Sequence, residues 1–278
     1  MESNLYVEER GNPEDSTIIF LHGLLGSSRN WRSVTKSLSE QYHTLCFDLP
    51  NHGKSFHEEE STVQKMVKSI HAELVQRGVS QFSLCGHSLG GKIAMRMACD
   101  YPKVVDQLVV ADIAPRDYPP EHHLPTLQAL IDLDISSLSS RKEADEALSE
   151  QIPNWAFRQF LLTNLECQDN RLFWLPDLVV LRDSIGSLSA NPLEIKDRFE
   201  GKTLFLCGGK SGYVRSEHHS SIKEFFPAAE IITLPDAGHD VHVEDRTGFM
   251  THLQIFFRED PDYLFSGLSS RAPFDALK

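Results

Sequence analysis

The chain has 278 residues, of which 40% are hydrophobic and 24% are charged, as in ordinary globular proteins. That length allows one large core, or one core that carries an inserted subdomain. The formal net charge of −13 and the lack of a basic run argue against a nucleic-acid partner, because phosphate binding needs clustered cations. The same charge disfavours binding to a strongly anionic membrane surface.

Nothing near the N-terminus resembles a targeting segment. The stretch MESNLYVEER lacks the basic and apolar regions of a signal peptide and is too acidic for a mitochondrial transit peptide. No apolar run approaches the roughly 18 residues that span a bilayer. The five cysteines are scattered without metal-type spacing, which predicts free thiols. We therefore expect a cytoplasmic protein without a membrane span.

Six short apolar runs predict strands that are buried on both faces of a parallel sheet. They are residues 17–23, 43–49, 82–87, 107–114, 203–209 and 230–235. Helical spacing is found in residues 61–77, 89–99 and 244–257, and Ser61 with Gln64 offers a capping box for the first helix. This alternation predicts an α/β fold with helices on both faces of the sheet.

One interval breaks the alternation. The stretch from Ala114 to Thr203 has no strong buried-strand run, although connections in compact domains are usually about 4–6 residues long. It is rich in leucine, tryptophan and phenylalanine at helical spacing, which indicates an inserted helical cap over the carboxyl edge of the sheet. We expect a core of residues 1–115 and 200–258, a mainly helical cap of residues 116–199, and a C-terminal tail of residues 259–278.

The stretch GHSLG places Ser88 where a buried strand turns sharply into a helix. Gly86 and Gly90 provide clearance for a strained backbone, which would hold the Ser88 hydroxyl above the sheet edge. The amide of Leu89 then lies at a helix N-terminus, where free N–H groups favour developing negative charge. We predict that Ser88 is a nucleophile and that Leu89 contributes to an oxyanion hole.

A serine hydroxyl needs a base, and His239 is the best placed of the thirteen histidines. It follows the last predicted strand on a glycine-containing loop, at the same sheet edge as Ser88. His239 and His242 form a possible metal pair, but no further ligand is evident nearby. We therefore expect His239 to act as the base and expect no metal site.

The acid that would orient the histidine is less evident. The loop after the strand 203–209 has Lys210 and Ser211 but no carboxylate, whereas Asp112 directly follows the buried run one strand earlier. A buried carboxylate requires a partner, which an imidazole can supply. Asp236 and Asp48 are the alternatives, and we interpret them as residues that shape neighbouring turns. We predict Asp112 as the acid.

A second oxyanion donor is expected from the loop HGLLGSS. The His22-Gly23 turn leaves the amide of Leu24 free to face the serine. We predict that Leu24 and Leu89 supply the two backbone N–H groups.

Five motifs in this order resemble the α/β-hydrolase fold, and more narrowly the YbfF-type bacterial esterases and their eukaryotic abhydrolase relatives. They are HGLLGSSRNW, DLPNHGKS, GHSLGGK, DIAP and DAGH. The resemblance covers roughly residues 5–258 and implies a Ser88-Asp112-His239 triad that hydrolyses carboxylic esters or acyl thioesters. Pro50 departs from the basic residue that is usual in these relatives, but it does not touch the triad.

The expected reaction passes through an acyl-serine intermediate and needs no metal or organic cofactor. Its partner would be a small-molecule ester or thioester with a small to medium acyl group. An α/β-hydrolase-fold lyase or carbon–carbon hydrolase, and a receptor with slow turnover, remain alternatives. Some of the cap's apolar residues are expected to line an acyl site, and we interpret three cations near the sheet edge as surface charges. The apolar candidates are Leu124, Leu127, Trp155, Phe160 and Trp174, and the cations are Lys92, Lys210 and Arg215.

Overall fold

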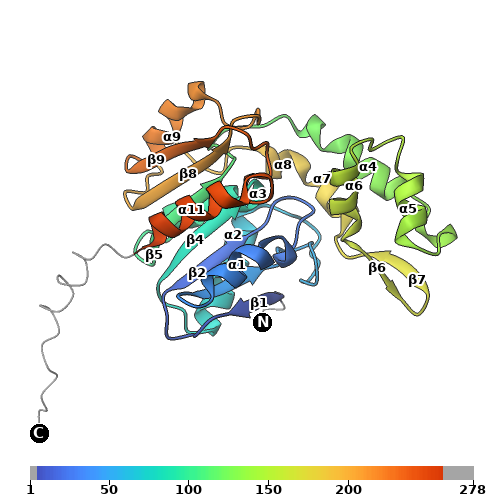
Figure 1. The fold of residues 1–278 in the computed structure, drawn as a ribbon, viewed down its shortest axis with the longest axis horizontal. Coiled ribbons are helices and arrows are strands. Elements are labelled where there is room, and N and C mark those ends of the chain that lie inside the picture. Colours follow the sequence, from blue (N-terminus) through green and yellow to red (C-terminus); the bar gives the residue numbers. More distant parts are fainter. Residues whose placement is uncertain (1–4, 259–278) are drawn as a thin grey trace, which may run out of the picture.

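A computed structural model describes residues 5–258, so the predicted tail 259–278 lies outside the described residues. Seven strands form one sheet in the order β1-β3-β2-β4-β5-β8-β9, as Figure 1 shows. β1 runs antiparallel to β3, and every other pairing is parallel. The strands are β1 (Val7–Arg10), β2 (Thr17–Leu21), β3 (His43–Phe47), β4 (Phe82–His87), β5 (Val105–Ala111), β8 (Lys202–Gly208) and β9 (Ala229–Leu234).

All six predicted strands are present, and β1 is an additional strand that the apolar pattern did not predict. Its sequence VEER is mostly charged and forms one edge of the sheet, where charged side chains reach solvent and discourage pairing with another chain. Glu8 pairs with Arg32 at 2.7 Å, and Glu9 accepts a hydrogen bond from His43 at 2.8 Å. The parallel α/β architecture that the sequence predicted is confirmed.

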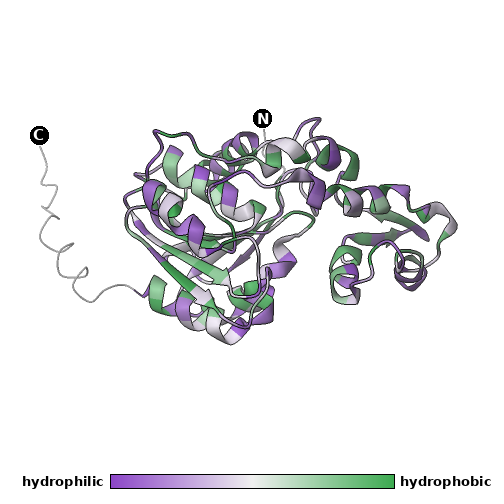
Figure 2. Cartoon of the chain, turned by 90° about the horizontal axis from the view of Figure 1, so that it is seen from above, coloured by the Kyte–Doolittle hydropathy of each residue, from purple (hydrophilic) through white to green (hydrophobic). Residues whose placement is uncertain are grey.

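Helices cover both faces of the sheet, and Figure 1 shows α1 and α11 on the near face. Alternate residues of each strand belong to two separate cores: Ile18 and Phe20 of β2 pack with α1 and α11, whereas Ile19 and Leu21 pack with α2 and α3. Figure 2 shows the hydrophobic colour concentrated in these strands. The helices of this part are α1 (Arg32–Leu38), α2 (Val63–Gln76), α3 (Leu89–Asp100), α9 (His219–Phe225), α10 (Val241–Glu244) and α11 (Arg246–Phe257), with 3-10 turns η1 (Ser28–Trp31) and η4 (Ser216–His218).

The capping box predicted from Ser61 at the start of α2 is wrong, because the N-cap is the next residue in the chain. Thr62 is the N-cap, and its hydroxyl accepts a hydrogen bond from the Lys65 amide at 3.2 Å. The buried hydroxyl of Ser61 instead accepts a hydrogen bond from the side-chain amide of Asn51, at 2.6 Å. Two adjacent hydroxyl residues give the same local signal, and only the tertiary contact of Ser61 distinguishes them.

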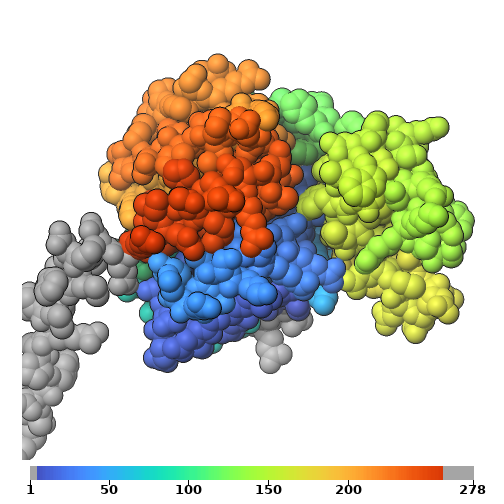
Figure 3. All heavy atoms as spheres, in the orientation of Figure 1, coloured from blue at the N-terminus to red at the C-terminus, as the bar shows by residue number. Residues whose placement is uncertain are grey.

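The segment between β5 and β8 forms a lobe beside the sheet, visible in yellow-green in Figure 3. It is mainly helical, as expected, but it also contains an antiparallel hairpin that the sequence did not predict. Its elements are η2 (Pro120–His122), α4 (Leu124–Asp132), η3 (Ile135–Ser137), α5 (Arg141–Ala147), α6 (Trp155–Leu162), β6 (Leu165–Gln168), β7 (Arg171–Trp174), α7 (Leu178–Asp183) and α8 (Ile185–Ser189). The exact division into core and cap stays a prediction. Among residues 5–258, no helix is both long enough and apolar enough to cross a membrane.

Candidate active site

Ser88 occupies a strained turn between β4 and α3. Its backbone has φ 52° and ψ −116°, a conformation that costs an ordinary residue about 1–3 kcal/mol. A Cβ atom on Gly86 would lie 2.2 Å from the carbonyl oxygen of Gly90, and one on Gly90 would lie 2.2 Å from the carbonyl oxygen of Leu21. The turn therefore requires glycine at both positions, and the half-buried serine projects from it into a groove.

The loop after β2 approaches the serine closely. A Cβ atom on Gly23 would lie 3.3 Å from the Cβ of Ser88, and Leu24 lines the same groove as Ser88. Within residues 5–258, the amides of Leu24 and Leu89 donate no hydrogen bond to the protein. Leu89 is the first residue of α3, so its N–H has no partner inside the helix. Leu24 and Leu89 therefore both have amides without a partner in the described residues, and both line a cavity that Ser88 also lines.

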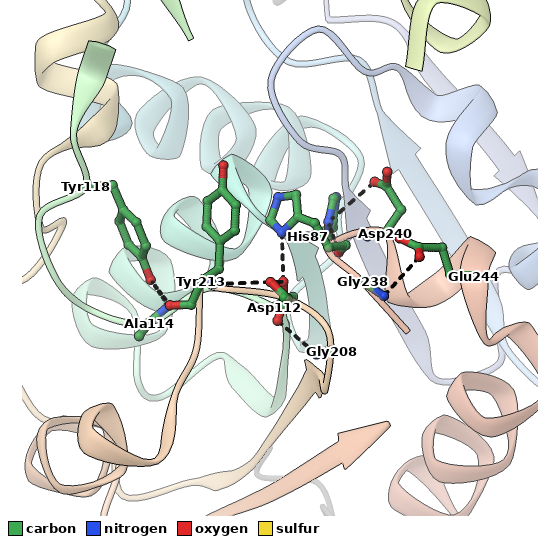
Figure 4. Close-up of polar contacts among 11 residues, drawn as sticks. His87, Asp112, Ala114, Tyr118, Gly208, Tyr213, Gly238, Asp240 and Glu244 are labelled. Carbon is green, nitrogen blue, oxygen red and sulfur yellow. Dashed lines mark hydrogen bonds and ion pairs between the residues drawn. The ribbon is translucent and has the colours of Figure 1, made fainter. Parts of the chain in front are cut away.

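Asp112 directly follows β5, and its side chain is completely buried. Its Oδ1 accepts a hydrogen bond from the Gly208 amide at 2.9 Å, which Figure 4 shows. Its Oδ2 accepts hydrogen bonds from the Ser211 hydroxyl and from Nδ1 of His239, the latter at 2.8 Å. Three donors thus satisfy a carboxylate that would otherwise be costly to bury.

Ser211 was not among the predicted site residues, because a carboxylate was the residue type expected in that loop. Ser211 lies shortly after β8, and β8 pairs directly with β5. The carboxyl ends of neighbouring parallel strands meet at one edge, so the order of the strands was the signal that would have placed Ser211 beside Asp112.

The His239 imidazole is held from several sides. Its Nδ1 faces Asp112, and the ring of Tyr213 stacks on it with centroids 3.8 Å apart. Its backbone carbonyl accepts a hydrogen bond from Nε2 of His87 at 2.9 Å. Because a carboxylate can only accept, the bond to Asp112 selects the tautomer of the neutral ring in which Nδ1 carries the proton and Nε2 has the lone pair. Ser88 and His239 line the same groove.

The loop that carries His239 is fixed by a carboxylate of α10. Glu244 accepts a hydrogen bond from the Gly238 amide at 2.9 Å, as Figure 4 shows, and another from the Asp240 amide at 3.1 Å. Both bonds lie next to His239 in the chain. They restrict the backbone on each side of the imidazole.

The two alternative acids lie elsewhere. Asp236 is 87% exposed and pairs with Lys210 at 3.2 Å. Asp48 accepts hydrogen bonds from the amides of Ser28 and Lys54, at 2.6 and 2.8 Å, and so braces the turn after β3. Asp112 is therefore the carboxylate in contact with His239.

The other histidine of the possible metal pair has a structural position. His242 is buried and its ring stacks on Trp31 with centroids 4.5 Å apart. Burial lowers the pKa of His242 to about 3, so the ring is neutral near pH 7. In the part of the chain that the structure describes, no cluster of three or more histidine, cysteine or acidic side chains could hold a metal ion.

Two cavities meet at Ser88. The groove has a volume of about 600 Å³ and is lined by Ser88, by His239 and by residues of α4 and α6. The chamber has a volume of about 30 Å³ and lies between Ser88, Lys92 and α8. Of the apolar candidates, Leu127 and Phe160 line the groove, whereas Trp155 is 65% exposed. Leu124 and Trp174 pack against the hydrophobic core without lining either cavity.

The structure corrects one expectation about a surface charge and finds a further polar side chain, His123, at the cavities. Lys92 is buried, not solvated, and its amine donates to the carbonyl oxygens of Ser189 and Ala190 at 2.5 and 2.6 Å. His123 lines both cavities, and burial lowers its pKa to about 4. Lys92 lies on a face of α3 that the inserted lobe covers, which helix periodicity in the core could not reveal.

Comparisons with known proteins show which family and fold the chain resembles. A profile described as "Alpha/beta hydrolase family" matches residues 18–250. The sn-1-specific diacylglycerol lipase ABHD11 of Mus musculus is 37% identical over 86% of this chain and 80% of its own length. Esterase YbfF of Escherichia coli is 26% identical over 88% of this chain and 94% of its own length.

A solved structure described as a marine microorganism esterase superimposes on the chain with a TM-score of 0.89. It is 30% identical and covers 92% of this chain and 100% of its own. The order of the strands, the strained turn at Ser88 and the match to the family profile are all consistent with one fold. The chain therefore belongs to the alpha/beta hydrolase family and has the α/β-hydrolase fold.

Proposed function

We propose that this chain is a serine hydrolase that cleaves carboxylic esters or acyl thioesters through an acyl-Ser88 intermediate. The observation that carries the proposal is the 2.8 Å contact between His239 Nδ1 and the buried Asp112, in a groove that His239 shares with Ser88. The names of the relatives, which include esterases and lipases, support an ester bond as the target.

In the first half of the reaction, Nε2 of His239 takes the proton of Ser88 as its Oγ attacks the acyl carbonyl carbon. The carbonyl oxygen becomes an oxyanion, and the free amides of Leu24 and Leu89 are the donors for it. Buried Asp112 stabilises the imidazolium that forms and keeps the proton on Nδ1. His239 then gives the proton to the leaving alkoxide or thiolate, and the acyl group stays on Ser88.

In the second half, water takes the place of the leaving group. His239 removes a proton from water as its oxygen attacks the acyl carbon, and a second oxyanion forms at the same two amides. Collapse returns the proton to Ser88 Oγ and releases the carboxylic acid. The cycle uses no metal ion and no organic cofactor.

Turnover of p-nitrophenyl acetate and butanoate, together with the corresponding CoA thioesters, tests the proposal. Wild-type protein should give many turnovers per active site, and Ser88→Ala should abolish them while the protein stays folded by circular dichroism. A single stoichiometric burst without further turnover would favour a slow receptor. Unchanged turnover in Ser88→Ala would overturn the proposal.

A further inference from the structure

The groove and the chamber differ in their access to the base. Both are lined by Ser88, Leu24, His123 and Tyr213, but His239 lines the groove and not the chamber. Leu89, by contrast, lines the chamber and not the groove. Ser88 therefore borders two cavities of unequal size, and the proton donor His239 lines only the larger one.

The chemistry of the proposed reaction assigns the two halves of a substrate to these spaces. The leaving oxygen or sulfur must receive a proton from His239, so the leaving group must lie in the groove. The acyl substituent is bonded to the same carbonyl carbon and points away from the leaving group. The chamber is the second space that Ser88 lines, and His239 does not line it.

The chamber is small and largely apolar. Ile113, Ile185 and Leu188 line it. Its volume of about 30 Å³ compares with the ~10–15 Å³ that one water molecule needs, so about two or three methyl-sized groups fit. An acyl group of two to four carbon atoms matches this space.

The hydrogen-bond donors of Lys92, the one lysine or arginine that the structure describes in the chamber wall, are already engaged by the protein. The Lys92 amine lies within hydrogen-bond distance of the carbonyl oxygens of Ser189, Ala190 and Arg116. The Tyr118 hydroxyl is also engaged, because it accepts from the Ala114 amide and donates to the Tyr213 carbonyl, each at 2.9 Å; Figure 4 shows the first of these bonds. A carboxylate on the acyl group would find no free donor on Lys92 or Tyr118, whose bonds instead fix the position of the chamber wall.

The same bonds connect the elements that form the chamber wall. Lys92 belongs to α3, which begins beside Ser88, and it ties the end of α8 to that helix. The Tyr118 amide donates to the Ser189 carbonyl at 3.0 Å and adds a second tie. Opening the chamber for a longer chain would break these contacts, so its size acts as a limit.

We propose that the chamber is the acyl subsite and that it restricts substrates to short acyl groups, while the groove accepts larger alcohol or thiol leaving groups. This inference rests on the proposed serine-hydrolase function. It goes further, because it names the half of the substrate that is selected and the wall that selects it.

Two substrate series on the wild-type protein test the inference. In the first, p-nitrophenyl acetate, butanoate, hexanoate and octanoate vary only the acyl group, and kcat/KM should fall at least about tenfold from butanoate to octanoate, because overpacking a rigid cavity is unfavourable. In the second, acetate esters of methanol, butanol and octanol vary only the leaving group, and kcat/KM should stay level or rise. A preference for octanoate in the first series would overturn the inference.

A pair of matched variants localises the effect. Leu188→Ala removes chamber wall and should raise the octanoate-to-acetate ratio of kcat/KM at least about tenfold. Leu181→Ala removes the same atoms from a buried residue of α7 that lines neither cavity, and this ratio should not change. Equal ratios in the two variants would contradict the assignment. If Leu188→Ala does not fold, Leu188→Val provides the same comparison with a smaller expected change.

Failure of the inference and failure of the proposed function are distinguishable. Fluorophosphonate labelling of Ser88 with turnover of any ester supports the function, whichever chain length is preferred. No labelling and no turnover would overturn both. Labelling and turnover with the best rate on long acyl chains would overturn only the acyl subsite.

Discussion

Nδ1 of His239 lies 2.8 Å from Oδ2 of Asp112, and the carboxylate is completely buried. The two residues are far apart in the chain and meet because β5 and β9 both end at the same edge of the sheet. The backbone of Asp112 has φ 48°, as unusual as the φ 52° of Ser88, which directly follows the neighbouring strand β4. Two adjacent strands thus end in strained residues, which is typical of a functional site.

Asp112→Asn should lower kcat by roughly 10⁴, because an amide no longer fixes the protonated Nδ1 of His239 or stabilises its imidazolium form. Steady-state kinetics with p-nitrophenyl butanoate measures this. Asp236→Asn, which alters an exposed carboxylate paired with Lys210, is the control and should keep kcat within about twofold. Near-normal activity in Asp112→Asn with loss in Asp236→Asn would show that the acid is misassigned.

Gly86→Ala should destabilise the protein by about 2 kcal/mol or more and should also impair Ser88, because the new Cβ meets the Gly90 carbonyl at 2.2 Å. Gly186→Ala is the matched control, since no atom lies within 4 Å of its Cβ position in helix α8. Alanine there should be neutral or stabilise by up to about 1 kcal/mol. Denaturant unfolding of both variants measures the difference, and equal free energies of unfolding would contradict the close approach at Gly86.

The buried amine of Lys92 makes the free energy of unfolding depend on pH in the alkaline range. Burial lowers its pKa to about 7, so between pH 7 and about 10.4 the unfolded chain binds more protons than the folded one, and stability rises with pH in this window. From pH 7.5 to 9 the expected gain in the free energy of unfolding is about 2 kcal/mol. Lys92→Met should remove this gain. If wild type and variant show the same pH dependence, the amine stays charged in the fold.

His242 makes the free energy of unfolding depend on pH in the acidic range. Its folded pKa of about 3 lies below the ordinary value of 6.5, so the unfolded chain takes up the proton first and stability falls as pH drops from about 6.5. Its Nδ1 is also buried without a hydrogen-bond partner in the described residues. His242→Phe should therefore stabilise the protein more at pH 5 than at pH 7.5, by about 2 kcal/mol. Thermal or urea unfolding at the two pH values checks this, and a pH-independent effect would count against it.

The elements that the sequence predicted are those whose signal is local. Buried parallel strands are continuous apolar runs, and the GHSLG turn requires glycine at Gly86 and Gly90 for steric reasons that hold in any chain with this geometry. The contact between Asp112 and His239 followed from the rule that parallel strands end at one edge.

The elements that the sequence did not predict depend on tertiary contacts. β1 is stabilised by pairing with β3 and by ion pairs such as that of Glu8, not by an apolar pattern. Lys92 is a polar residue on an amphipathic helix, and only the carbonyls of Ser189 and Ala190, about a hundred residues later in the chain, account for its burial. The hairpin of β6 and β7 is short and half-exposed, so it lacks the continuous apolar run that marked the core strands.

Identification of the residue that reacts with a fluorophosphonate tests the central claim most directly. After labelling and proteolysis, mass spectrometry should find one adduct per chain, on the peptide that contains Ser88, and the labelling rate should fall by orders of magnitude in His239→Ala. An adduct on another residue, or an unchanged labelling rate in His239→Ala, would contradict the account.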